Sequence, residues 1–397
     1  MSTKTIALIL SFLSFFAFWN PNGQPNKIPE TRSYAGEVQP GTDMPVDKYG
    51  EWPTKDFQTG PRPAWFVPAV ARTAYVFQRF INGNVFSDSV LVLHKGKLVY
   101  EDYAKGWDRD ATHQMYSVTK SLVSTLVGIA IGEGKIKGVD QKVIDFFPDA
   151  VIAPGQESKR DMTIEHLLTH TSGLPGDGDR EAMDYPWWEA DASSGRKYDS
   201  GLVAFETPQL AEPGKVHSYS SGAGMQTLAC LVSRAVKMNL FEYAQKKLFK
   251  PLGMTSVIWD AAPDGNTYGG FGLSMTPRDM LRYGYLYLNN GRWEDRQIIP
   301  ADYVALTPPR SKAAEAYGYL FWNTSLIPLD ASYEASGSFG QFIAIMPEWD
   351  AVIVRTGSIG PVTKAIYTKT PDDLFERLLL PIIAMKGVPW QYFRDAL

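Results

Sequence analysis

One stretch, MYSVTKSLVSTLVGIAIGEG from Met115 to Gly134, constrains the fold of this chain more than any other. Between His113 and Glu133 its only charged side chain is Lys120, and most other residues are aliphatic, Ser, Thr or Gly. A helix that faces solvent usually carries several charged residues, so this segment is expected to be buried. A lysine in a buried helix has to have its charge neutralised or take part in a function. Lys120 is therefore the first candidate functional residue.

The length and composition are those of a globular protein. The chain has 397 residues, of which 44% are hydrophobic and 21% charged, so it can hold one large domain or two closely packed ones. The formal net charge of −4 does not favour a nucleic-acid partner. The single cysteine, Cys230, excludes an intramolecular disulfide and a multi-cysteine metal site, and its apolar surroundings predict a buried side chain.

The N-terminus has the pattern of a targeting segment. Lys4 is followed by an uncharged run, Thr5 to Trp19, which is shorter than the roughly 20 residues needed to span a bilayer and suits the core of a signal peptide. Bulky aromatic residues stand where a small-x-small cleavage site is expected, so an uncleaved membrane anchor is the alternative. We therefore expect an exported protein of the cell envelope or periplasm, which contacts a membrane only through residues 1–19.

Periodicity and turn residues divide the rest of the chain into elements. Residues 20–63 are rich in Pro, Gly, Asp and Thr and predict an extended linker or strap. Residues 89–103 form two β-rich runs around Lys95–Gly96 and predict a β-hairpin. Helices are expected at 65–81, from about 117 onward, and at 163–170, 224–237, 241–249, 275–291 and 371–385, and strands at 317–324, 340–347 and 351–357.

Residues 177–213 are polar and have little regular pattern. A segment of this length without periodicity is expected to form a lid or a cleft wall, or to be disordered. Trp187 and Trp188 within it either line the cleft or pin the segment to the body of the protein.

The order of the elements predicts an α+β fold. Strands at both ends of the chain with helices between them indicate an antiparallel sheet with flanking helices, built from both termini, that carries an inserted all-helical domain. On this interpretation residues 64–110 and 255–397 form an α/β domain. Residues 111–254 form the helical domain, which includes the irregular insert 177–213.

Ser117 and Lys120 lie three residues apart at the start of the apolar stretch. In a helix that begins near Ser117, both side chains project from the same face and can meet. The helix dipole and the apolar neighbours both disfavour a charged ammonium, so Lys120 is expected to help take the proton of the Ser117 hydroxyl. The free N–H groups of the first turn can also bind an oxyanion. About one Ser-x-x-Lys match is expected by chance, and the second match, Ser194 to Lys197, is interpreted as a solvated loop.

Each candidate residue also has an ordinary structural interpretation. Ser117 is then a plain N-cap, and Lys120 is a lysine that reaches the surface. Tyr219 precedes another expected helix and either relays the serine proton to a leaving group, if the nearby lysine lowers its pKa from about 10, or simply forms a hydrogen bond there. The glycine-flanked strand of residues 334–357 either lets a substrate approach the backbone or is a bulged edge strand.

Five segments together resemble a known family. In order and spacing they are similar to serine hydrolases with the β-lactamase/penicillin-binding-protein fold, on the side of class C β-lactamases and esterases. The resemblance extends to the branch with aminohexanoate-oligomer hydrolases and carboxylesterases and covers residues 65 to 390. The segments are SVTK at Ser117, TIEHLLTHTSGLP at 163–175, PGKVHSYSSGAG at 213–224, GGFGLSMTPRDMLRYGYLYLNNG from Gly269 and SGSFGQ at 336–341.

The resemblance implies a role for each site residue and no cofactor. Ser117 would be the acylated nucleophile, Lys120 its proton partner and Tyr219 the general acid or base. The backbone N–H groups of Ser117 and Gln341 would form the oxyanion hole. The residues that bind substrate would be Ser221, at the end of the second motif, and Ser338, Phe339 and Gly340, which form the third.

Two departures from the family pattern bear on the substrate. Ser221 stands where Asn is common, so an amide for holding a substrate carbonyl is lost. Ser338 stands where β-lactamases and peptidases have Lys, or related hydrolases His, so an anionic substrate would forfeit a contact of roughly 1.5–3 kcal/mol. Arg278 or Arg355 is a candidate replacement for that cation. The pattern therefore favours neutral carboxylic esters or small amides, with β-lactams and cell-wall peptides as alternatives.

Two interpretations come from other classes of protein. His166 and His170 are four apart on an expected helix and could chelate zinc, but Leu167 stands where a metalloprotease has Glu, so no metal site is predicted. A non-catalytic envelope protein would keep the same fold to hold peptidoglycan fragments or a partner. The presence of the serine, the lysine and the tyrosine favours an enzyme that acts on a small molecule. The pattern does not indicate an oligomeric state.

Overall fold

The computed structural model describes residue 57 and residues 85–103, 106–179, 197–308, 317–323 and 332–359. Several predicted segments therefore lie outside the described residues. They are the N-terminal segment 1–19, nearly all of the linker 20–63, the helices 65–81 and 371–385, and the tryptophans Trp187 and Trp188.

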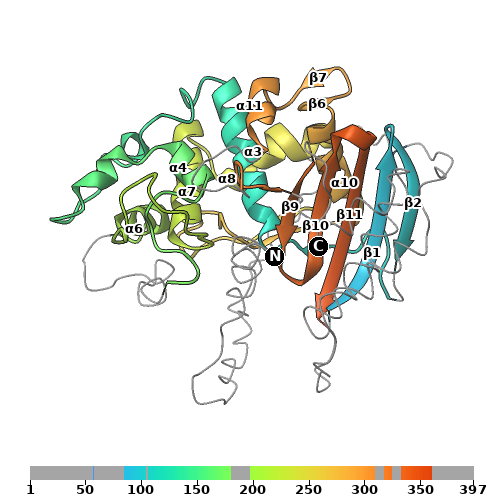
Figure 1. Cartoon of the computed structure of the whole chain (residues 1–397), viewed down its shortest axis with the longest axis horizontal. Helices are drawn as coiled ribbons and strands as arrows, with labels where there is room; N and C mark the ends of the chain where they lie inside the picture. Colours follow the sequence, from blue (N-terminus) through green and yellow to red (C-terminus); the bar gives the residue numbers. More distant parts are fainter. Residues whose placement is uncertain are drawn as a thin grey trace, which may run out of the picture.

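A six-stranded antiparallel sheet forms one side of the described structure (Figure 1). Its strand order is β2-β1-β11-β10-β9-β8. The hairpin predicted at 89–103 is confirmed, and it turns through Lys95 and Gly96, whose φ angles of 50° and 68° suit a tight two-residue turn. The strands are β1 (Val85–His94), β2 (Lys97–Tyr103), β8 (Trp322–Asn323), β9 (Tyr333–Gly337), β10 (Gln341–Met346) and β11 (Ala351–Ile359).

The centre of this sheet joins the two ends of the described chain. β1 pairs with β11 from Val85 opposite Ile359 to His94 opposite Ala351. The predicted antiparallel sheet built from both termini is therefore confirmed. Two small sheets lie elsewhere, with the orders β3-β5-β4 and β6-β7. Their strands are β3 (His113–Gln114), β4 (Ile258–Trp259), β5 (Leu273–Met275), β6 (Arg292–Trp293) and β7 (Arg296–Gln297).

Helices occupy the middle of the chain, as predicted. In Figure 1, α4, α6, α7 and α8 lie on the side of α3 away from the sheet, and α10 packs on β10 and β11. At the contact of α10 with the sheet, a Cβ on Gly284 would come within 2.5 Å of Val352, so glycine is needed there for close packing. The α-helices are α3 (Val118–Gly132), α4 (Ile164–Leu168), α6 (Ser200–Glu206), α7 (Ala223–Val236), α8 (Leu240–Ala244), α9 (Lys250–Leu252), α10 (Pro277–Leu288) and α11 (Ala301–Leu306).

Helix α6 corrects the expectation that residues 177–213 lack regular structure. Its N-cap, Asp199, accepts a hydrogen bond from the Leu202 N–H at 2.9 Å, and Arg234 of α7 donates to the same carboxylate at 2.6 Å. A seven-residue helix is too short to show a clear period in sequence. The packing of α6 on α7 therefore stabilises a helix that its own pattern does not reveal.

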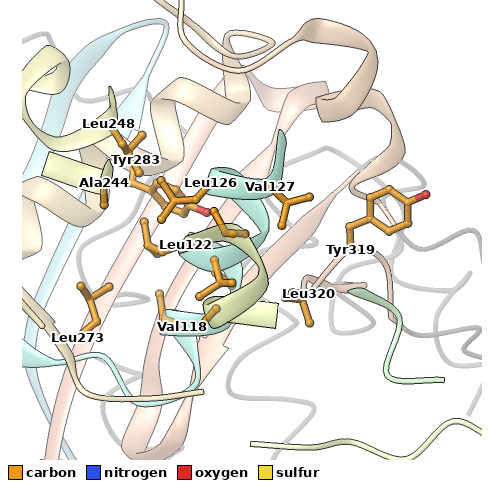
Figure 2. Close-up of a cluster of buried hydrophobic side chains, with 14 of the residues drawn as sticks. Val118, Leu122, Leu126, Val127, Ala244, Leu248, Leu273, Tyr283, Tyr319 and Leu320 are labelled. Atoms are coloured by element: carbon orange, nitrogen blue, oxygen red, sulfur yellow. The ribbon is translucent and has the colours of Figure 1, made fainter. Parts of the chain in front are cut away.

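Helix α3 is the buried helix that the apolar stretch predicts. Its apolar residues Val118, Leu122, Leu126 and Val127 belong to the core cluster shown in Figure 2. Its polar side chains are paired inside this core, because an unpaired hydroxyl there would be costly. Thr125, for example, lies within 2.7 Å and 2.8 Å of two tyrosine hydroxyls of α10. Within the described ranges, no helix is both long and apolar enough to cross a membrane.

Candidate active site

A strained turn places Ser117 at the start of α3. Tyr116 has φ of 47°, a conformation that costs energy for a bulky residue and often occurs at functional sites. Its ring packs edge-on against Phe339, with the ring centroids 4.9 Å apart. Ser117 is the N-cap of α3, but its side chain does not cap the helix. Its hydroxyl is therefore available for other contacts.

The Lys120 amine lies beside that hydroxyl in the protein interior. Its Nζ donates to Ser117 Oγ at 2.9 Å, to Ser221 Oγ at 2.8 Å and to the Gly270 carbonyl at 3.0 Å. The side chain has no exposed surface, so the alternative of a lysine reaching solvent is wrong. Three acceptors at these distances hold Nζ in one position next to the serine.

Burial changes the acidity of this amine. It lowers the pKa of Lys120 to about 8, because the charged form loses its hydration, while the Asp177 carboxylate raises the pKa by a smaller amount. About a tenth of the amine is then neutral at pH 7. The expectation of a basic, partly neutral lysine agrees with this environment.

A second buried lysine shows that burial alone does not make a site. Lys159 also has its pKa lowered to about 8 by burial. Its Nζ donates to the carbonyls of Phe205 and Thr207, at 2.8 Å and 2.6 Å. Neither partner can act as a nucleophile, so Lys159 holds two chain segments together. Lys120 differs because two of its three partners are the hydroxyls of Ser117 and Ser221 rather than carbonyls.

Tyr219 completes the predicted group. The Lys120 Nζ lies 4.7 Å from the centroid of its ring. Burial raises the pKa of Tyr219, and a hydrogen bond with Ser117 lowers it by less. The hypothesis that the lysine lowers this pKa is therefore wrong, because loss of hydration is the larger effect. Tyr219 is a neutral phenol at any ordinary pH, which suits a proton donor better than a base.

Asp177 is a site residue that the sequence analysis missed. Its two carboxylate oxygens accept from the backbone N–H and the Oγ–H of Ser221, both at 2.6 Å. Its own N–H donates to the Tyr219 carbonyl at 2.7 Å. The family segment TIEHLLTHTSGLP ends at Pro175, and the glycine-rich turn just after it has two acidic residues, Asp177 and Asp179, which were the available signal. Ser221 contacts the lysine as well as this carboxylate.

Two glycines let neighbouring loops approach the Tyr219–Ser221 segment. A Cβ on Gly270 would lie 2.0 Å from the Ser221 carbonyl oxygen, and a Cβ on Gly176 would lie 2.7 Å from that of Tyr219. Real Cβ atoms do not come so close to backbone atoms, so any larger residue would displace these loops. The glycines therefore set the positions of the Gly270 carbonyl and of Asp177 around the lysine.

The end of strand β9 lies against Ser117. Gly337, the last residue of β9, approaches the start of α3 so closely that its Cβ would lie 3.2 Å from the Ser117 nitrogen. Gln341, the first residue of β10, pairs with Gly337. The Gln341 side chain is buried and forms hydrogen bonds with the Gly357 backbone. Only its backbone can therefore serve the predicted oxyanion hole, and that role stays a prediction.

The third motif forms the turn between β9 and β10. Ser338 is exposed, whereas Phe339 and Gly340 adopt φ angles of 62° and 83° that bend the chain. Arg355 of β11, which is buried, donates to the Gly340 carbonyl at 2.6 Å and so stabilises the turn. Arg278 forms a two-pronged ion pair with Glu101, at 2.7 Å and 2.8 Å. Both arginines suggested as replacement cations are thus engaged by the protein.

Aromatic rings surround the Tyr219 side of the site. The Tyr219 ring stacks on Trp322 with a centroid distance of 5.5 Å and lies 5.9 Å from Tyr317. The His170 ring is 4.6 Å away, and its Nδ1 accepts from the Ser220 N–H at 3.4 Å. These rings surround Tyr219 with weakly polar side chains, which raises the cost of placing a charge beside it.

The two histidines considered for zinc are held separately by the backbone. His166 Nδ1 accepts from the Thr163 N–H at 3.1 Å in a capping box at the start of α4, whereas His170 contacts Ser220. Among the described residues, no group of three or more His, Cys, Asp or Glu side chains is placed to hold a metal ion.

Comparison with known proteins identifies the family. The Beta-lactamase family model matches residues 72–367 of the chain. This protein belongs to the Beta-lactamase family. The membership confirms the resemblance drawn from the five motifs, the α+β fold of β-lactamase/transpeptidase type and the enzyme class, a serine hydrolase.

Members of the family with different names are similar to this chain. Penicillin-binding protein 4 of Amycolatopsis lactamdurans is 24% identical over 76% of this chain and 83% of its own length. The 6-aminohexanoate-dimer hydrolase of Paenarthrobacter ureafaciens is 25% identical over 68% of this chain and 72% of its own. A crystal structure of a family VIII carboxylesterase shares the fold, with a TM-score of 0.59 and 17% identity over 82% of this chain and 99% of its own.

Proposed function

We propose that this protein hydrolyses neutral carboxylic esters or small amides through an acyl-enzyme on Ser117. The observation that carries the proposal is the contact of a buried Lys120 amine with the Ser117 hydroxyl at 2.9 Å. Tyr219 stands beside both groups as a neutral phenol. A base, a nucleophile and a proton donor therefore meet at one place, which is what acyl transfer requires.

The residues suggest the following sequence of steps. The neutral amine of Lys120 takes the Ser117 proton as Oγ attacks the substrate carbonyl carbon. The N–H groups of Ser117 and Gln341 stabilise the negative charge that develops on the carbonyl oxygen. As the carbonyl re-forms, the Tyr219 phenol gives its proton to the departing alcohol or amine and regains one from Lys120. Water then attacks the acyl carbon, and the serine leaves with a proton returned through the same groups.

Two features support a neutral substrate. Ser338 presents a hydroxyl where an anion-binding cation is common in the family, and Arg278 and Arg355 are both engaged elsewhere. The buried rings next to Tyr219 make its surroundings weakly polar, which disfavours a carboxylate there. The aminohexanoate-dimer hydrolase and carboxylesterase names of similar proteins agree with an amide or ester substrate. The similarity to a penicillin-binding protein favours β-lactams and cell-wall peptides as the second candidate substrates.

The decisive experiment is labelling of the protein with a serine-reactive fluorophosphonate, together with turnover of p-nitrophenyl esters. We expect both in the native protein and neither in Ser117→Ala. Ser256→Ala, at an exposed position that is not among the site residues, serves as the matched control and should behave like the native protein. If the native protein is neither labelled nor active, the proposal is wrong and a non-catalytic binding protein is favoured.

A substrate panel tests the preference for neutral groups. The panel contains p-nitrophenyl esters, small amides, nitrocefin and a peptide ending in D-Ala-D-Ala. We expect the highest kcat/KM among the esters. Efficient turnover of nitrocefin and the peptide, with the esters ignored, would reverse this ranking.

Export of the protein is a separate proposal, supported by the sequence of residues 1–19 alone. Cell fractionation of the native chain and of a chain lacking these residues tests it. The native chain is expected in the envelope fraction, and equal distribution of both chains would contradict export.

A further inference from the structure

We propose that Asp177 is a positioning residue that acts through Ser221 to aim the Lys120 amine at Ser117. The inference rests on the proposed function, because it assigns a role within that same site. Its basis is a continuous line of hydrogen bonds. The Asp177 carboxylate accepts from Ser221, the Ser221 oxygen accepts from Lys120, and Lys120 contacts the Ser117 hydroxyl.

The direction of each hydrogen bond follows from the chemistry of Asp177. An ionised carboxylate can only accept, so the single hydroxyl proton of Ser221 is committed to Asp177 Oδ2 at 2.6 Å. The Ser221 oxygen can then act toward Lys120 only as an acceptor. The Gly270 carbonyl, 3.0 Å from Nζ, is also an acceptor and nothing else. Two of the three neighbours of the amine can therefore only accept a hydrogen bond from it.

This assignment fixes where the lone pair of the neutral amine points. A neutral amine has two N–H bonds and one lone pair. When its two N–H groups serve Ser221 and Gly270, the lone pair faces the third neighbour, Ser117 Oγ at 2.9 Å. That is the arrangement in which Lys120 accepts the serine proton. Without Asp177, the Ser221 hydroxyl would be free to rotate and donate to the lone pair itself, which would compete with Ser117.

Asp177 is held rigidly enough for this role. One carboxylate oxygen binds the Ser221 backbone N–H at 2.6 Å, and the Asp177 N–H binds the Tyr219 carbonyl at 2.7 Å. Together with the close approach of Gly176 to Tyr219, these bonds lock the turn of Asp177 onto the segment that carries both Tyr219 and Ser221. The carboxylate therefore moves with the two groups that it serves.

Three titratable groups of the described structure face the Lys120 amine and set how it responds to pH. The Asp177 carboxylate, reached through Ser221, favours the charged form, and burial opposes that form. The Tyr219 ring lies 4.7 Å from Nζ and is neutral. His170 is neutral as well, because burial and the lysine charge hold its pKa well below the ordinary value. Asp177 is thus the anion that acts on this amine.

The sequence departure at Ser221 fits this arrangement. The family commonly has Asn at this position, and an amide supplies both an acceptor and donors from one side chain. A serine is shorter and its hydroxyl can turn either way. The pairing of Ser221 with Asp177 gives the hydroxyl one fixed direction and makes it an acceptor for Lys120.

Asp177→Asn tests the proposal, with Asp179→Asn as the matched control. Asp179 lies in the same turn, and its carboxylate accepts from the Gly176 N–H at 2.7 Å and from Ser218 at 3.1 Å, but it does not contact Ser221. The measurement is the pH profile of p-nitrophenyl ester hydrolysis and of fluorophosphonate labelling, with circular dichroism to verify folding. For Asp177→Asn we expect kcat to fall about tenfold at little change in KM, because the base is misdirected.

The acid side of the profile distinguishes positioning from a structural role. Loss of the carboxylate removes the charge that favours the ammonium, so the acid limb should move to lower pH in Asp177→Asn and stay in place in Asp179→Asn. Ser221→Ala combined with Asp177→Asn should cost no more than Ser221→Ala alone, since both act on one line of hydrogen bonds. An unshifted limb, or equal losses in the two aspartate variants, would overturn the proposal.

A measurement that needs no turnover separates this inference from the proposed function. Titration of the Lys120 amine by 15N NMR of lysine-labelled protein should show a lower pKa in Asp177→Asn than in the native chain or in Asp179→Asn. If Ser117 is never labelled, the proposed function is wrong even when this shift is present. If labelling occurs and the shift is missing, the role of Asp177 alone is refuted.

Discussion

The acidity of Lys120 gives the sharpest prediction of how activity depends on pH. Burial lowers its pKa from 10.5 to about 8. At pH 7 this shift leaves about 300 times more neutral amine than an unperturbed lysine would have. Because the neutral form is the one that can take the serine proton, activity should be lost as the pH falls through this pKa. The rate should drop about tenfold for each pH unit below 7 and level off above 8 to 9.

The assay is the single-turnover release of p-nitrophenol, followed between pH 5.5 and 9.5. Single-turnover conditions report acylation of Ser117 rather than product release. Lys159→Met is the matched control, because Lys159 is also buried and has a pKa of about 8, but its Nζ donates to two carbonyls and lies over a phenylalanine ring. The control should keep the same acid limb. A limb near pH 6.5 would point to a histidine as the base, and a flat profile would also refute the reasoning.

Three substitutions test the geometry around the lysine and the buried helix. Gly270→Ala should lower kcat at least about tenfold in the ester assay, because the new Cβ would lie 2.0 Å from a backbone oxygen and displace the carbonyl that holds Lys120. Tyr219→Phe should lower kcat by about 10²-fold or more by removing the proton donor, and unchanged activity would exclude that role. Gly128→Ala should destabilise the fold by about 1–3 kcal/mol in urea unfolding, because its Cβ would lie 2.5 Å from the Tyr303 ring. Ester turnover per folded molecule should stay the same in that variant, and a loss of turnover without a loss of stability would contradict the packing argument.

Much of the fold could be predicted because its signals are local. The hairpin turn at Lys95–Gly96 depends on adjacent residues and lies where the sequence analysis placed it. Helix α10, which begins after its N-cap Thr276, lies within the helix expected at 275–291. Helix α6 was missed because its stability comes from packing on α7 and from the Asp199 cap. Such tertiary support leaves no periodic pattern within seven residues. The predicted division into two domains stays a prediction.

The site was predictable where spacing along one helix determines the contact. Ser117 and Lys120 meet because they are three apart on α3. Asp177 joins them from a distant loop, and no period in the sequence connects it to Lys120. The rise in the Tyr219 pKa could not be predicted from the sequence either. It follows from burial, which depends on residues such as Trp322 that pack on Tyr219 from another part of the chain.

The pairing of β1 with β11 has a consequence for how the enzyme matures. Ser89 and Thr356, in contact at 2.6 Å on these strands, are 267 positions apart in the chain. During synthesis the serine and its lysine leave the ribosome long before β9, whose last residue, Gly337, packs beside Ser117. Contacts of such long range form late and slowly. A nascent chain would thus carry its nucleophile well before it can use it, and catalysis would begin only when the last strands have closed the sheet.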